Sequence, residues 1–111
     1  ALNAMDRGRD PLEVRLRTAL GLIHAGRGEP AAASRELEQA LTLAEATLGP
    51  DHLGVATVLG HLAGLRAAAG ETATARTMLA RALEIRERTL GASHPDTRQT
   101  ADRLAALAGQ N

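Results

Sequence analysis

The chain repeats itself at an interval of 42 residues, and this repeat constrains the fold more than any other feature. The segment LGPDH at 48–52 returns as LGASH at 90–94. When residues 10–51 are aligned with 52–93 without a gap, 13 of the 42 aligned positions are identical. A third copy begins at His94 and stops after half its length. A regular repeat of this length predicts stacked units that bury apolar surface against their neighbours.

Each copy contains two segments in which apolar residues recur at helical spacing. In the second segment of each full copy, alanine and leucine alternate along one stripe, as in Ala33, Leu37 and Ala40. In the first segments, the stripe is made by Leu16, Leu20 and Ile23, by Val58, Leu62 and Leu65, and by Ala101, Leu104 and Leu107. Because this spacing is that of a helix with one buried face, we expect all of these stripes to face a core.

Glycine and capping residues mark the ends of these segments. Gly28 and Gly70 separate the two segments of each full copy, and Gly49 and Gly91 end the second segments, where a left-handed backbone commonly closes a helix. Asp10 before Pro11, and Ser93-His94 before Pro95, are typical of helix N-termini. We therefore expect five helices, near residues 11–26, 30–48, 53–69, 72–90 and 95–108.

Composition also favours helices, because the chain has no Phe, Tyr or Trp and its core must be built from Leu, Ala, Val, Ile and Met. Strands prefer β-branched and aromatic residues, whereas alanine lets helices approach closely. We predict an all-α fold of two and a half repeats. Residues 1–9 are expected to be disordered or a remnant of cloning. Residues 10–111 are expected to be one domain, with full copies at 10–51 and 52–93 and a half copy at 94–111.

The contiguous segment RALEIRERTLGASHPDT, together with the 42-residue period, resembles the long tetratricopeptide repeats of the kinesin light chain family. The resemblance covers about residues 10–108, and such repeats are common in bacterial multidomain proteins. It implies antiparallel helical hairpins in a right-handed superhelix, with Gly21 and Ala63 as close-contact points between paired helices. His24 and Arg66 stand where the family often has tyrosine. The resemblance further implies that the first helices line a concave face, on which partner peptides usually lie.

Catalysis, metal binding and cofactor binding find little support in the sequence. There is no Cys, and Ser93 beside His94 is explained as a helix cap. His52 and His94 occupy equivalent places one repeat apart, so we expect capping or turn roles. His24 and His61 lack a second histidine three or four residues away, whereas a metal site needs three or four converging ligands. We therefore predict that the chain is not an enzyme and holds no cofactor and no metal.

Charge and hydropathy exclude other partners. Thirteen basic residues balance thirteen acidic ones, so the basic surface of a nucleic-acid-binding protein is missing. No apolar segment approaches the length of a membrane span, and no signal peptide is recognisable. We expect a cytoplasmic protein that binds neither nucleic acid nor membrane.

Gly60 and Gly64 are the least expected residues, because each costs about 1 kcal/mol relative to Ala inside a helix. Either they reflect a glycine-rich composition, or a partner segment or twin subunit approaches this face closely. The candidate partner-binding residues on or near the concave face are Arg15, Thr18, Leu22, Thr57, Gly60, His61, Gly64, Gln99, Asp102 and Arg103.

The favoured hypothesis is a module that binds a protein or peptide on the concave face, as part of a larger bacterial regulatory protein. One alternative is a self-assembly element that forms homodimers and has no separate ligand. A second alternative is a small-molecule-binding helical domain. Because the last helix matches only half of a repeat, part of its apolar stripe is expected to be uncovered, which favours a homo-oligomer through this helix or a continuation of the repeats.

Overall fold

The structure, a computed structural model, describes residues 11–109 and contains five α-helices within them. The expected disorder or foreign origin of residues 1–9 lies outside this range. The helices are α2 (Pro11–Gly26), α3 (Pro30–Leu48), α4 (Leu53–Ala68), α5 (Thr72–Leu90) and α6 (Pro95–Ala108). These bounds confirm the helices expected from the sequence, and the described residues contain no strand.

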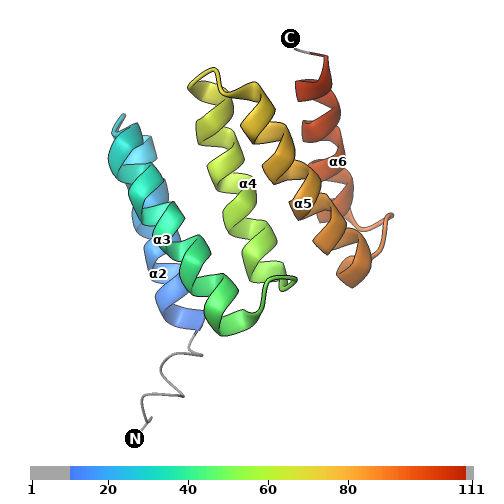
Figure 1. Ribbon diagram of the computed structural model, residues 1–111, viewed down its shortest axis with the longest axis horizontal. Helices are drawn as coiled ribbons and strands as arrows, with labels where there is room; N and C mark the ends of the chain where they lie inside the picture. Colours follow the sequence, from blue (N-terminus) through green and yellow to red (C-terminus); the bar gives the residue numbers. More distant parts are fainter. Residues whose placement is uncertain (1–10, 110–111) are drawn as a thin grey trace, which may run out of the picture.

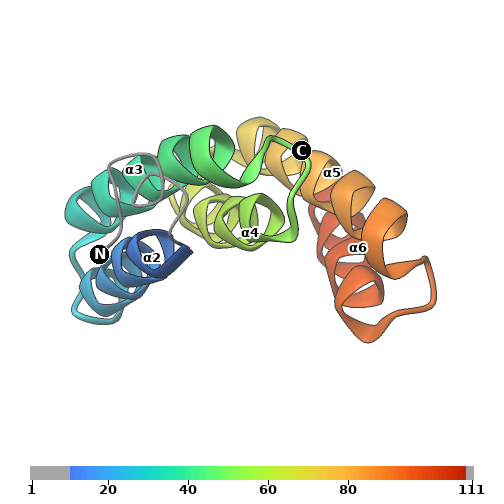
Figure 2. The ribbon, with the colours of Figure 1, turned by 90° about the horizontal axis from the view of Figure 1, so that it is seen from below.

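Antiparallel hairpins build the molecule, as Figure 1 shows: α2 pairs with α3, α4 pairs with α5, and α6 follows alone. Contacts between α3 and α4, and between α5 and α6, join one copy to the next. The result is an arc of about 50 × 34 × 19 Å. Figure 2 shows α3 and α5 on its outer side and α2, α4 and α6 on its inner side. The first helix of every copy therefore lines the concave face.

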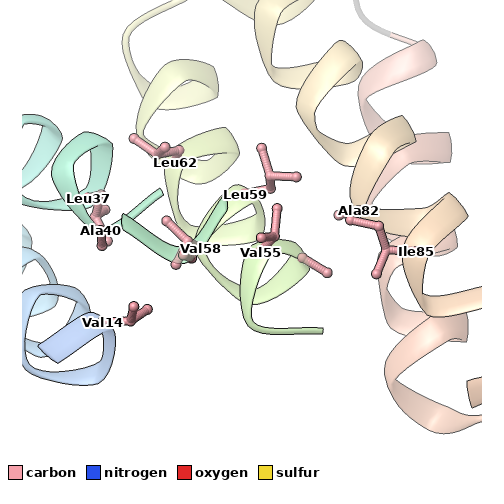
Figure 3. Close-up of a cluster of buried hydrophobic side chains, with 11 residues drawn as sticks. Val14, Leu37, Ala40, Val55, Val58, Leu59, Leu62, Ala82 and Ile85 are labelled. Atoms are coloured by element: carbon pink, nitrogen blue, oxygen red, sulfur yellow. The ribbon is translucent and has the colours of Figure 1, made fainter. Parts of the chain in front are cut away.

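The larger core cluster lies around α4, which packs between α3 and α5 (Figure 3). Val58 and Leu62 lie on the side of α4 that faces α3, while Val55 and Leu59 lie on the side that faces α5. All four are at most 3% exposed. A helix covered on both sides needs apolar residues around much of its circumference, which α4 supplies.

The ends of the helices follow the expected signals with two differences. Gly28 and Gly70 have φ of +75° and +84°, as the turn inside each hairpin requires. Gly49 has φ 99° and ψ 149°, a conformation that is open to glycine but is not the left-handed helical one expected. At the start of α6, the cap is His94 and not Ser93, because the Asp96 backbone N–H donates to His94 Nδ1 at 3.0 Å. His52 caps α4 in the same way, through the Gly54 N–H at 2.9 Å.

The apolar stripe of α2 corrects the sequence prediction. Leu16, Leu20 and Ile23 were expected to face a core, yet they are 56%, 45% and 55% exposed. Their equivalents in α4 are buried or half-buried against the preceding hairpin. In α2, the buried positions are instead Val14 and Gly21, on the side packed against α3. The pattern of apolar residues is the same in both helices, but α4 has a neighbour on that side and α2 has none among residues 11–109.

Candidate functional site

A hollow of about 270 Å³ lies between α2 and α4. We call it the α2–α4 groove. Its surface is mainly aliphatic, with one guanidinium and two threonines at its border. Four of the candidate residues predicted from the sequence, Arg15, Thr18, Leu22 and Thr57, line it. The complete lining is Val14, Arg15, Thr18, Ala19, Leu22, Gly54, Thr57 and Val58.

The polar groups of this groove are largely used within their own helices. The Thr18 hydroxyl donates to the Val14 carbonyl oxygen at 2.8 Å, and the Thr57 hydroxyl donates to the Leu53 carbonyl oxygen at 3.2 Å. Each threonine can then present its methyl group to the hollow. Leu22 is 43% exposed, and a solvent-facing leucine beside an apolar hollow favours contact with another apolar group. The groove can therefore hold an apolar side chain more readily than a charged one.

A second hollow of about 190 Å³ lies further along, between α4, α5 and α6. It contains two more candidate residues, Gly64 and Arg103. Its other surface is aliphatic, and its complete lining is Ala63, Gly64, Ala67, Leu79, Arg103, Ala106 and Leu107. Six of the ten candidate residues thus line two neighbouring hollows that share α4.

Arg103, a residue of the same chain, approaches Gly60 closely and lies at ordinary contact distance from Gly64. Arg103 Nη2 donates to the Gly60 carbonyl oxygen at 2.9 Å. A Cβ atom added at Gly60 would lie 3.3 Å from Arg103 Nη1, and one added at Gly64 would lie 3.6 Å from Nη2. Two glycines one helical turn apart leave the space in which the guanidinium crosses α4. Of the two explanations that the sequence left open, a close approach is present at Gly60, but α6 of the same chain makes it.

Positive charge gathers at this point of the concave face. Burial lowers the pKa of His61, and the nearby charges of Arg103 and Arg86 lower that pKa further. Arg86 Nη1 donates to Thr100 Oγ1 at 2.7 Å, which ties α5 to α6. No ion pair of Arg86 or Arg103 is found among residues 11–109. At neutral pH the local charge therefore comes from the two guanidinium groups, because a lowered pKa keeps His61 neutral.

The remaining candidates, Gln99 and Asp102, are exposed on α6 and line neither hollow. Sequence analysis missed Ala19 and Ala106, which do line the hollows. The repeat itself contained the signal, because Ala19 is 42 residues before His61 and Ala106 is 42 residues after Gly64. Shifting every candidate by one repeat would have found both.

A larger hollow, of about 520 Å³, lies elsewhere, on α3 beside Arg17 of α2. It is shallow, and three of its polar side chains, those of Arg17, Glu38 and Gln39, already have partners. Arg17 Nη1 donates to Gln39 Oε1 at 2.7 Å and lies 3.5 Å from Glu36 Oε2. Size alone is a poor guide to a binding site here, since the smaller α2–α4 groove has the more apolar surface.

No three His, Cys, Asp or Glu side chains among residues 11–109 are placed to share a metal ion. None of the described helices is long and apolar enough to cross a membrane.

Comparison with known proteins agrees with this geometry. The sequence profile of the tetratricopeptide repeat matches residues 12–88 and 55–111. No curated protein matches the chain. Among solved structures, the crystal structure of BtubC (BKLC) from P. vanneervenii superposes with a TM-score of 0.84 at 22% sequence identity. That match covers 90% of this chain and 40% of BtubC, so the chain spans about two fifths of the length of that protein. The chain belongs to the tetratricopeptide repeat family, with repeats of the kinesin light chain type.

Proposed function

We propose that this chain binds a protein or peptide segment on its concave face, with an apolar side chain of the segment in the α2–α4 groove. Tetratricopeptide repeat domains are in general protein–protein interaction modules and are typically not catalytic. One observation supports placing the bound segment in the α2–α4 groove. Four residues from two copies border this one aliphatic hollow: Arg15, Thr18, Leu22 and Thr57. Stacked repeats present extended concave surfaces of this kind to their partners.

The chemistry of the groove suggests what the segment supplies. An apolar side chain would cover Leu22 and Val58 and remove apolar surface from water, at about 25 cal/mol per Å² buried. Arg15, at the border, can donate to a backbone carbonyl or a carboxylate of the same segment. The identity of the partner stays open. Membership of a larger bacterial regulatory protein, and a cytoplasmic setting, stay predictions.

The small-molecule alternative is less well supported. Ligand pockets usually enclose about 300–1,000 Å³ and aim a few polar groups inward. The α2–α4 groove measures about 270 Å³, and both of its threonine hydroxyls donate to their own helix. The self-assembly alternative has an observation of its own, in the surfaces at the two ends of the arc.

A peptide-display selection against the chain tests the proposal. Selected peptides should bind the wild-type chain and lose at least about tenfold in affinity with Leu22→Glu or Thr57→Arg, because a charge would then occupy the apolar groove. Ala80→Glu is the matched control, since Ala80 is exposed on the outer helix α5. Circular dichroism must show that every variant keeps its helices. If selected peptides bind all three variants as tightly as the wild-type chain, the groove is not the binding site.

A further inference from the structure

The first helix of the arc exposes an apolar surface that the repeat normally covers. We call Leu16, Leu20 and Ile23 the α2 face; between 45% and 56% of each residue is accessible to solvent. Among residues 11–109, α2 packs mainly against α3, on its opposite side, and makes fewer contacts with α4. A group of large aliphatic residues that is this accessible on one side of a helix is typical of an interaction site.

The other copies show what such a face contacts when it is covered. Val58 and Leu62, which are 42 residues after Leu16 and Leu20, are at most 1% exposed where α4 faces α3. In the half copy, Leu104 and Leu107 pack against the cluster that contains Leu79 of α5. The equivalent surface is thus covered by a neighbouring helix in both places, and the α2 face has the shape for a third contact of the same kind.

The last helix exposes a surface of small side chains, in contrast to the large side chains of the α2 face. Ala105 and Ala108 are exposed, and Ala101 is partly exposed, on the side of α6 that is turned away from α5. We call these three residues the α6 face. Their equivalents in the earlier copies show how it can be used. Ala63, one repeat before Ala105, and Gly21, two repeats before it, are both buried beneath the paired helix. At Gly21 the approach is so close that an added Cβ would lie 2.7 Å from Leu37 Cγ.

The two faces match in spacing as well as in relief. Leu16, Leu20 and Ile23 are separated by four and then three residues, and so are Ala101, Ala105 and Ala108. Large side chains of one helix fit between small side chains of another when both rows follow the helical repeat. We propose that the occupant of the α2 face is the α6 face of a second copy of this chain, so that copies associate head to tail.

Such a contact differs from those between copies inside the chain, where a second helix meets the next first helix, as α3 meets α4 and α5 meets α6. Here two first helices, α2 and α6, would meet, and each would cover the apolar surface of the other. Because the two faces differ and lie on different helices, the contact is heterologous, and each added copy leaves one face of each kind free. Association is therefore open-ended unless the ring closes. It is also weak, because one helix pair supplies few residues compared with the roughly 20–30 residues a side of a stable complex.

Sedimentation equilibrium of the whole chain over a wide concentration range is the first test. The average mass should rise from the monomer value of 11.5 kDa and pass twice that value. Concentrations up to about 1 mM are needed, because this is the range in which weak contacts form. A strict monomer at the highest concentration would overturn the proposal.

Two variants, each with one face blocked, give the sharper test. Leu20→Glu places a carboxylate on the α2 face, and Ala105→Glu places one on the α6 face. Each variant alone should associate at least about tenfold more weakly than the wild-type chain, because an unpaired carboxylate would be buried in the contact. An equimolar mixture should form a one-to-one dimer and stop there, since each variant still carries the face that the other has lost.

Matched controls separate this contact from the concave site. Leu22→Glu changes a leucine of nearly equal exposure, 43% against 45% for Leu20, but on the concave side. Ala80→Glu changes an exposed alanine of α5. Both should associate like the wild-type chain. Loss of association in one blocked variant only, or in the Leu22→Glu control, would overturn the head-to-tail arrangement, as would a mixture that stays monomeric. Peptide binding at the groove should survive Leu20→Glu, so the two proposals fail independently.

Discussion

Helices α2 and α4 occupy the same position in successive copies, yet their aligned residues differ in exposure to solvent. Leu20 and Leu62 are aligned and identical, but Leu20 is 45% exposed while Leu62 is fully buried. The difference arises because α4 packs between α3 of the preceding hairpin and its own partner α5. Among the described residues, α2 has neighbours on one side. In a solenoid, stability is the sum of each repeat and its interfaces, so equal residues need not contribute equally.

The comparison is tested most strongly by truncating the two aligned leucines. Leu62→Ala should lower the free energy of unfolding by about 2–5 kcal/mol, since it removes buried methyl groups and leaves a cavity. Leu20→Ala should cost under about 1 kcal/mol, as for other half-exposed positions. Urea unfolding at low protein concentration, followed by circular dichroism, measures both. Equal losses would show that the α2 face is covered in solution.

The close-contact position in α2 gives the next largest effect. Gly21→Ala brings a Cβ atom to 2.7 Å from Leu37 Cγ and 3.0 Å from its Cδ2, and Leu37 is itself buried. Overpacking should cost about 1–3 kcal/mol, and the better helix propensity of alanine returns part of this.

Gly64→Ala is the matched change in α4 and should have the opposite sign. Its new Cβ would make ordinary contact, 3.6 Å from Arg103 Nη2, at an exposed position. It should stabilise the chain by about 0.5–1 kcal/mol through helix propensity. Thermal unfolding of the two variants side by side tests both signs. Stabilisation by Gly21→Ala would contradict the close approach of α2 and α3.

The turns inside the hairpins should behave alike in both copies. Gly28→Ala and Gly70→Ala each force a side chain onto a backbone with φ of +75° or +84°, although nothing lies within 4 Å of either added Cβ. Each should cost about 1 kcal/mol, through backbone strain alone. Chemical denaturation of the two variants checks this. A large difference between them would mean that the turns, too, depend on neighbouring copies.

The smallest effect concerns His61, which has alanine at the aligned position of α2. Burial and the charges of Arg103 and Arg86 lower its pKa below the ordinary value of 6.5 in the folded state. The unfolded chain then binds the proton more readily, so stability falls as the pH drops through 6.5 and levels off below the lowered pKa.

Replacing His61 with Gln should remove this fall, while His24→Gln, a change in α2, should leave it in place. Urea midpoints measured between about pH 7 and pH 5 provide the test, above the range in which most carboxylates titrate. A fall of equal size in the His61→Gln variant would assign the pH dependence to another group.

The candidate site was partly accessible from the sequence. Helical spacing and the expected concave placement of the first helices were enough to select Arg15, Thr18, Leu22 and Thr57, which border one groove. The reason for Gly60 was not accessible, because it depends on Arg103 reaching across from another helix. Hydrogen bonds between residues 43 positions apart leave no local pattern in a single sequence.

The sequence by itself determined the helices and their ends, because those depend on interactions within a few residues. Proline at position 95, the histidine caps and the glycines at positive φ act locally, and the 42-residue period made the copies equivalent. Only the tertiary structure decided which apolar stripe is buried. A stripe such as Leu16, Leu20 and Ile23 indicates that a helix can bury one face. Burial itself requires another helix to pack against that face. That is a property of the stack, and it differs between α2 and α4.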